Sequence, residues 1–270
     1  MQRLWILLVA VSLVALLATP ATAITRGGVP DGDDHPYVGL MVANVDDTPA
    51  WRCSGALISP TLYVTAGHCT FGADSATIWF ETTLEPDRGA FGYPFGGTTS
   101  VTGTPYTHPA YLDEAFFLYD LGVVVLDEPV VLEGGYASLP DVGDVDTIGF
   151  GRNAATITAV GYGLQGVRPN AISLLTRYQA ELFIVDRKGV AGLKQYEAAF
   201  EGSGSFVMSG DAKHGGTCFG DSGGPLLRGD TIVGVTSFGL NANCAGIGGG
   251  YRIDKPQDLA FINDLLEVTS

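Results

Sequence analysis

Three segments of the sequence carry side chains that together could perform nucleophilic catalysis. Ser222 lies in Gly-Asp-Ser-Gly-Gly-Pro (220–225), His68 lies in Val-Thr-Ala-Gly-His-Cys (64–69), and Asp120 opens the apolar run Asp-Leu-Gly-Val-Val-Val-Leu (120–126). A serine nucleophile needs a base that accepts its proton, a carboxylate that orients the base, and N–H donors for the developing oxyanion. A carboxylate at the mouth of an apolar strand must find a partner if it is buried, because its desolvation is otherwise costly. The three residues therefore form a candidate catalytic set.

The segment around Ser222 also fits the G-x-S-x-G elbow of α/β-hydrolases, which would indicate a lipase or an esterase. Those enzymes place the catalytic histidine after the serine. All four histidines of this chain precede Ser222: His35, His68, His108 and His214. The chain order therefore excludes that class. We take His68 as the base, because the adjacent Cys69 could hold its loop, and we expect the other three histidines in surface loops.

Another motif matches a cofactor site only formally. Residues 161–166, Gly-Tyr-Gly-Leu-Gln-Gly, have the spacing of a dinucleotide fingerprint and follow a strand-like run over 156–160. Such a loop must open directly into a helix, but Pro169 and Asn170 interrupt the residues that follow, and no βαβ pattern surrounds them. The sequence also contains neither CxxC nor a Cys/His metal spacing. We therefore expect no cofactor and no metal ion.

Composition limits the fold class and the partners. The 270 residues include 14 Lys and Arg, 29 Asp and Glu, and 38 Gly, with a net charge of −15. This acidity disfavours nucleic acid as a partner. Short β-rich stretches, such as 76–80, 156–160 and 231–237, alternate with turn residues and favour an all-β sandwich or barrel. Helical spacing occurs at 188–200 and 256–267; the rest of 24–254 is predicted as strands and turns, with an exposed excursion over 84–104.

The N-terminal residues are typical of a secretory signal. Arg3 precedes an apolar run over 4–17, and Ala-Thr-Ala (21–23) has the pattern of a cleavage site. The run is shorter than the roughly 20 residues that a membrane-spanning helix needs. We therefore expect a signal peptide over 1–23, a mature chain that starts at Ile24, and a secreted, extracellular protein without membrane contact. Four cysteines in an exported chain predict two disulfides, for which the sequence allows three pairings.

The segments around His68, Asp120 and Ser222, in this order, resemble the chymotrypsin-like (trypsin-fold) serine peptidases. Four shorter segments add to the similarity: 108–111, 160–163, 237–239 and 251–253. The resemblance implies an all-β fold of two antiparallel six-stranded β-barrels, 24–133 and 134–254, followed by a C-terminal helix and tail over 255–270. It also implies that Ser222 attacks the substrate carbonyl, that His68 transfers the proton, and that Asp120 holds the imidazole.

The resemblance assigns the other site residues as well. The N–H groups of Gly220 and Ser222 would form the oxyanion hole. The disulfides would join Cys53 to Cys69 and Cys218 to Cys244. Gly216 would form the base of the specificity pocket, where trypsin-like members carry Asp. The residues around this base would be Phe219, Ser237, Phe238, Gly239 and Gly249. Such an open, uncharged pocket predicts cleavage after Phe, Tyr or Leu rather than after Lys or Arg, because a buried ammonium without a partner is costly.

In the family that the sequence resembles, activation frees an N-terminal Ile that pairs with the Asp before the nucleophile. Here these residues would be Ile24 and Asp221, and twelve residues lead from Ile24 to Pro36, as in the family. Removal of the signal would thus activate the enzyme directly. The predicted protein is a secreted, monomeric serine endopeptidase that acts on proteins or peptides, with protein inhibitors as further partners. The alternative is a catalytically silent trypsin-fold protein that serves in binding.

Overall fold

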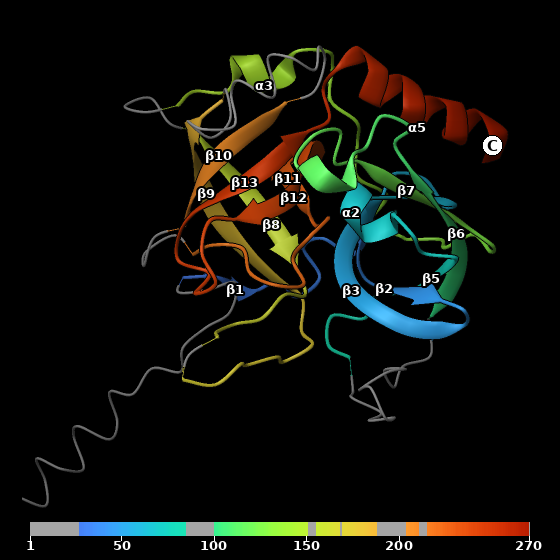
Figure 1. Cartoon of the computed structure of the whole chain (residues 1–270), viewed down its shortest axis with the longest axis horizontal. Helices are drawn as coiled ribbons and strands as arrows, with labels where there is room; N and C mark the ends of the chain where they lie inside the picture. Colours follow the sequence, from blue (N-terminus) through green and yellow to red (C-terminus); the bar gives the residue numbers. More distant parts are fainter. Residues whose placement is uncertain are drawn as a thin grey trace, which may run out of the picture.

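Two β-barrels lie side by side, and a C-terminal helix follows them (Figure 1). The fold is that of a computed structural model, which describes residues 27–84, 100–150, 155–167, 169–187, 204–210 and 215–269. The expected all-β class with two six-stranded antiparallel barrels and a C-terminal helix is confirmed. The predicted signal peptide and the predicted helix over 188–200 lie outside the described residues. Among the described residues, no helix has the length and apolar character needed to cross a membrane.

The first barrel closes in the order β2-β3-β4-β7-β6-β5. Its strands are β2 (Val38–Val45), β3 (Thr48–Leu57), β4 (Leu62–Thr65), β5 (Ser75–Trp79), β6 (Val101–Thr107) and β7 (Gly122–Leu126). The β2–β3 hairpin turns at Asp46 and Asp47, whose φ angles of 49° and 60° suit the tight turn that two twisted strands require. The predicted excursion over 84–104 is wrong at its end, because residues 101–104 belong to β6.

The second barrel consists of β8 (Thr156–Gly161), β9 (Tyr178–Asp186), β10 (Ser205–Gly210), β11 (Pro225–Arg228), β12 (Thr231–Gly239) and β13 (Gly246–Arg252). The pairing of β8 with both β9 and β11 closes it. The short strand β1 (Val29–Pro30) precedes the first barrel in the chain but pairs with β9 of the second. Apolar residues on alternate positions fill the interior, among them Ile157, Leu182, Phe206 and Val233. Because β1 pairs with β9 and leads into β2, it connects the first barrel to the second.

Within the described residues, three one-turn helices interrupt the stretch that was predicted as strands and turns. They are α2 (Gly67–Thr70), η1 (Asp113–Ala115) and α3 (Asp144–Thr147). Helices this short span too few residues to produce a hydrophobic period, so the sequence pattern could not reveal them. The final helix α5 (Pro256–Thr269) starts at the predicted proline and lies against the first barrel, where Ile262 is fully buried (Figure 1).

His108 was expected in a surface loop, and this prediction is wrong. The residue follows β6, is only 5% exposed, and stacks on Tyr119 at 5.2 Å between ring centroids. Its Nε2 lies 3.6 Å from the carboxylate of Asp258 in α5, which also accepts hydrogen bonds from the Tyr251 hydroxyl. The returning helix α5 therefore covers a loop that would otherwise face solvent. His35 is partly buried beside Asp31, and His214 lies outside the described residues.

Arg177 joins the two barrels from within. The side chain is 1% exposed, and its Nε donates to Asp31 at 2.7 Å. Its other nitrogens donate to the carbonyls of Gly32 and Val38, which lead into the first barrel, and to the carbonyl of Phe80 beyond β5. A buried guanidinium with this many acceptors fixes the relative position of the segments that carry them. The two barrels are thus held in a defined arrangement relative to each other.

Candidate active site

The partly exposed His68 and the buried Asp120 form a pair at one end of the first barrel. The antiparallel pairing of β4 with β7 sets Thr65 opposite Gly122, so the residues just beyond these strands meet. His68 Nδ1 lies 3.0 Å from both carboxylate oxygens of Asp120, and the His68 backbone N–H donates to the same carboxylate at 2.8 Å. Asp120 is fully buried. Its carboxylate therefore fixes both the main chain and the ring of His68.

The pair has the electrostatics of a general base. Burial disfavours the imidazolium, but the Asp120 carboxylate outweighs this effect and raises the pKa of His68 above its ordinary value. Asp120 holds the proton on Nδ1, which leaves Nε2 as the proton acceptor. The hydroxyl of Ser237 on β12 donates to Asp120 at 2.5 Å, so the second barrel also orients the carboxylate. Sequence reasoning placed Ser237 near the substrate and missed this contact.

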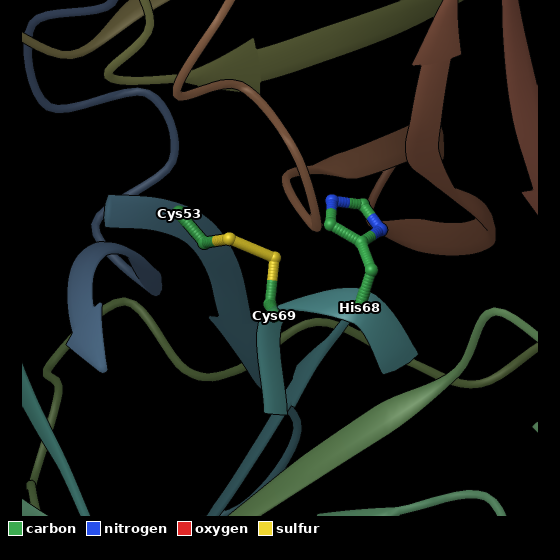
Figure 2. A group of neighbouring side chains, drawn as sticks. All are labelled: Cys53, His68 and Cys69. Carbon is green, nitrogen blue, oxygen red and sulfur yellow. A yellow bond between two sulfur atoms is a disulfide. The ribbon is translucent and has the colours of Figure 1, made fainter. Parts of the chain in front are cut away.

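Ser222 lies on the loop that leads into β11. Its carbonyl accepts from the Ser54 N–H at 2.8 Å, which attaches the loop to β3 of the first barrel. Gly223 has a φ of 76°, and a Cβ there would lie 2.0 Å from the Thr65 hydroxyl at the end of β4. Only a glycine therefore allows the loop to approach the barrel that carries His68. The imidazole of His68 projects from α2 toward the second barrel (Figure 2).

Two N–H groups of the same loop are available to bind an oxyanion. Within the described part of the chain, the backbone N–H groups of Gly220 and Ser222 donate to no protein acceptor. The Phe219 carbonyl accepts from the Leu164 N–H at 2.8 Å. Because the carbonyl and N–H of one trans peptide point in opposite directions, the Gly220 N–H points away from Leu164. The assignment of these two N–H groups to an oxyanion hole stays a prediction.

Asp221 is buried behind this loop. It is 1% exposed, and its carboxylate accepts from the backbone N–H groups of Gly163 and Cys218, both at 2.8 Å. Burial raises the pKa of Asp221 to about 6, although these hydrogen bonds and the nearby Arg52 favour the ionised form. A Cβ on Gly161 or Gly163 would lie 2.5 or 2.3 Å from the carboxylate. The glycines that imitated a dinucleotide fingerprint thus make room for Asp221.

The predicted partner of Asp221, Ile24, lies outside the described residues. The first described residues, Gly27 and Gly28, run close to Gly215. A Cβ on Gly215 would lie 3.1 Å from the Gly28 nitrogen and 3.5 Å from the Gly27 carbonyl carbon. Gly215 precedes Asp221 by six residues. Residues 27 and 28 therefore lie next to a residue that shortly precedes Asp221 in the chain.

Both disulfides hold active-site segments, with the pairing that the family resemblance implied. Cys53 on β3 bonds to Cys69 on α2, next to His68, and Cys218 beside the nucleophile bonds to Cys244 between β12 and β13. The cysteine sulfurs and a ring nitrogen of His68 lie within 4.8 Å of one another. Figure 2 shows that the two sulfurs form a disulfide. Metal binding requires thiolates, so this cluster is not a metal site.

A cavity of about 360 Å³ opens beside Ser222. It is lined by Phe116, Thr217, Cys218, Phe219, Ser222, Thr236, Ser237, Phe238, Gly239, Leu240, Asn241, Ala242 and Cys244. Four of the six residues expected to bind substrate are among them: Phe219, Ser237, Phe238 and Gly239. Sequence reasoning missed Phe116, whose ring lies 6.2 Å from that of His68 and 6.4 Å from that of Phe238 between centroids. The sequence feature that could have indicated a binding role for Phe116 is the pair of adjacent phenylalanines shortly before Asp120.

The remaining two residues, Gly216 and Gly249, do not line this cavity, although the sequence predicted both in the specificity pocket. Gly216 lines an adjoining cavity of about 20 Å³, which shares five lining residues with the larger one: Thr217, Gly239, Leu240, Asn241 and Cys244. The ring of Phe238 covers Gly249, because a Cβ there would lie 2.1 Å from a ring carbon. Aromatic rings therefore bound the larger cavity, whereas the sequence predicted an open pocket with glycines at its base and walls.

Comparison with known proteins identifies the family and agrees with this fold. The family model described as Trypsin matches residues 28–255, so the chain belongs to the trypsin family, as the resemblance predicted. Trypsin iota of Drosophila melanogaster is 28% identical, over 92% of this chain and 94% of its own. A trypsin of Simulium vittatum is 30% identical, over 91% and 96%. The scabies mite inactivated protease paralogue S-D1 shares the fold, with a TM-score of 0.67 and 18% identity over 90% of this chain and 98% of that one.

Proposed function

We propose that this protein is an active serine endopeptidase that cleaves peptide bonds through an acyl-enzyme on Ser222. The observation that carries the proposal is the pairing of His68 with the buried Asp120, with the imidazole oriented toward the barrel that carries Ser222 and its two available N–H donors. Family membership supports the same general activity. Each part of the arrangement has a function in acyl transfer.

The reaction proceeds in two halves. Ser222 Oγ attacks the substrate carbonyl carbon while His68 Nε2 takes the hydroxyl proton, and the oxyanion binds the N–H groups of Gly220 and Ser222. The intermediate then expels the amine, which receives the proton from His68, and leaves an ester on Ser222. Water repeats the sequence with His68 as base, releasing the carboxylic acid and restoring the serine. Asp120 stabilises the imidazolium that forms in each half.

The preferred residue before the scissile bond is bulky and apolar: Phe, Tyr or Leu. The cavity beside Ser222 supports this proposal, because Phe116, Phe219, Phe238 and Leu240 line it and its described lining contains no Asp, Glu, Lys or Arg. Its volume of about 360 Å³ is sufficient for an aromatic side chain. An Arg or Lys in such a cavity would lose its hydration without gaining a partner.

Activation requires a free N-terminus at Ile24, whose ammonium pairs with Asp221. The buried carboxylate supports this pairing, because burial raises its pKa and an adjacent cation would stabilise its charge. The three peptide units that join Ile24 to Gly27 can span about 10 Å, which sets how far the Ile24 ammonium can reach from Gly27.

The signal pattern over 1–23 and the two disulfides support secretion. We further propose a monomer that acts on protein or peptide substrates and binds protein inhibitors, with barrels over 24–133 and 134–254.

The second candidate is a silent binding protein, because the fold is shared with an inactivated paralogue. Treatment of the chain that starts at Ile24 with diisopropyl fluorophosphate separates the two. An active peptidase gains one phosphoryl adduct on Ser222, and Ser222→Ala gains none. Absence of the adduct on the folded wild-type protein would favour the binding protein.

Chromogenic peptides test the proposed preference for apolar residues. Phe substrates should react faster than Arg substrates, and the opposite order would contradict an apolar preference.

A further inference from the structure

We propose that Ser54 is a positioning residue whose hydroxyl holds the oxyanion hole in its binding conformation. Ser54 lies on β3 of the first barrel, one residue after Cys53, and is fully buried. The nucleophile loop, residues 218–224, belongs to the second barrel. The inference rests on the proposed function and extends it to a residue that does not contact the reacting atoms.

Ser54 makes four hydrogen bonds to three separate segments. Its hydroxyl donates to the Gly220 carbonyl at 2.8 Å and accepts from the Tyr162 N–H at 3.0 Å. Its backbone N–H donates to the Ser222 carbonyl at 2.8 Å. Its carbonyl accepts from the Thr65 hydroxyl at 2.8 Å. One side chain thus connects the end of β8 with the nucleophile loop, while its main chain connects that loop to β3.

The bonded peptide lies between the two oxyanion donors. The Gly220 N–H belongs to the peptide before it and the Ser222 N–H to the peptide after it. Gly220 has a φ of 96°, which a glycine can leave at little steric cost. The Ser54 hydroxyl restrains this flexible position by fixing the direction of the Gly220 carbonyl. Without it, rotation about Gly220 would move the two N–H groups relative to each other.

A serine suits the position because the bridge needs both a donor and an acceptor on a short side chain. A hydroxyl can accept a hydrogen bond from the Tyr162 N–H and at the same time donate one to the Gly220 carbonyl. Space is limited, because a Cβ on Gly224 would lie 3.2 Å from the Ser54 Cβ, and a Cβ on Gly161 would lie 3.1 Å from its hydroxyl. A larger side chain has no room. Alanine fits but leaves both buried backbone groups without a partner.

The test is Ser54→Ala in the chain that starts at Ile24, with Ser205→Ala as the matched control. Ser205 is a serine of β10 that is 1% exposed and lies outside the nucleophile loop and the cavity. Diisopropyl fluorophosphate titration counts competent sites, so that kcat refers to folded enzyme alone. With a Phe peptide amide, we expect Ser54→Ala to lower kcat about tenfold and to change KM less than twofold, because the oxyanion forms after substrate binding.

A second measurement reports on the oxyanion itself. A peptide aldehyde that ends in phenylalaninal forms a hemiacetal whose oxygen occupies the oxyanion site. Its affinity should fall about tenfold in Ser54→Ala and stay unchanged in Ser205→Ala. Should Ser54→Ala fail to fold, Ser54→Gly removes the same hydroxyl with a smaller side chain and carries the same expectation.

Three results would overturn the inference: unchanged kcat and aldehyde affinity in a titrated Ser54 variant, a loss confined to KM, or an equal loss of kcat in Ser205→Ala. A wild-type protein that neither reacts with the fluorophosphate nor cleaves the peptide would instead contradict the proposed function, so the two failures are distinguishable.

Discussion

The Gly163 N–H donates to the buried carboxylate of Asp221 at 2.8 Å, at a point where Gly163 has no room for a side chain. A Cβ would lie 2.3 Å from Asp221 Oδ2. The relationship links the segment that follows β8 of the second barrel to the residue that precedes the nucleophile. Position 163 must therefore be a glycine for the carboxylate to keep its place. Because Asp221 belongs to the nucleophile loop, the carboxylate cannot move without moving that loop.

Gly163→Ala should therefore displace Asp221 and the nucleophile loop. We expect kcat/KM for a Phe peptide to fall about 100-fold, which is the size of effect seen when one oxyanion donor is lost. Gly166→Ala is the control, because a Cβ there would meet no atom nearer than 3.7 Å. Activity of Gly163→Ala within threefold of wild type would show that the carboxylate can shift without harm.

The pH dependence of kcat/KM should reflect the His68–Asp120 pair. Because Asp120 raises the pKa of His68 above its ordinary value of 6.5, activity should rise through an acid limb that lies above this value, as the imidazole loses its proton. Asp120→Asn removes the stabilising charge, so the limb should move to lower pH and kcat should fall about 10⁴-fold. A pH–rate profile with the same limb in both proteins would contradict this role for Asp120.

Asp221 should make stability depend on pH when its partner is missing. Its pKa of about 6 exceeds the ordinary 3.8, so the stability that it contributes is complete below the ordinary value and is lost as pH rises through 6. A chain that starts at Gly27 lacks Ile24. Relative to its own Asp221→Asn variant, it should lose about 3 kcal/mol of unfolding free energy between pH 3 and pH 8.

Urea denaturation at several pH values measures this loss. In the chain that starts at Ile24, the ammonium should offset most of it, because the charged carboxylate then has a partner. Equal pH dependence in the two chains would show that Ile24 does not pair with Asp221.

Phe116 should contribute to substrate binding more than to chemistry. Its ring lines the cavity and contacts the Phe238 and His68 rings edge-on. Phe116→Ala should raise KM for Phe and Leu peptides about tenfold, since burying an aromatic side chain against this surface stabilises the complex by roughly 1–2 kcal/mol. Phe150→Ala is the control, because Phe150 has similar exposure and lies outside the cavity. An unchanged KM in Phe116→Ala would remove this residue from the binding site.

Much of the fold and site could be predicted from the sequence, because the signals are local. Strand β8 at 156–161 and the helix that begins at Pro256 follow from periodicity and from the proline. The class of site followed from three segments and their order. His108 marks the limit of this approach: nothing near it in the chain predicts the helix that covers it.

The sequence by itself therefore determined the family, the barrel class and the candidate nucleophile, base and carboxylate. Only the tertiary structure decided which groups surround them. Ser237 reaches Asp120 across 117 residues of chain, and Ser54 reaches Gly220 across 166. Phe238 covers Gly249 through the pairing of β12 with β13. Such contacts depend on how distant strands pair and how the two barrels meet, and these are properties of packing that no short segment encodes.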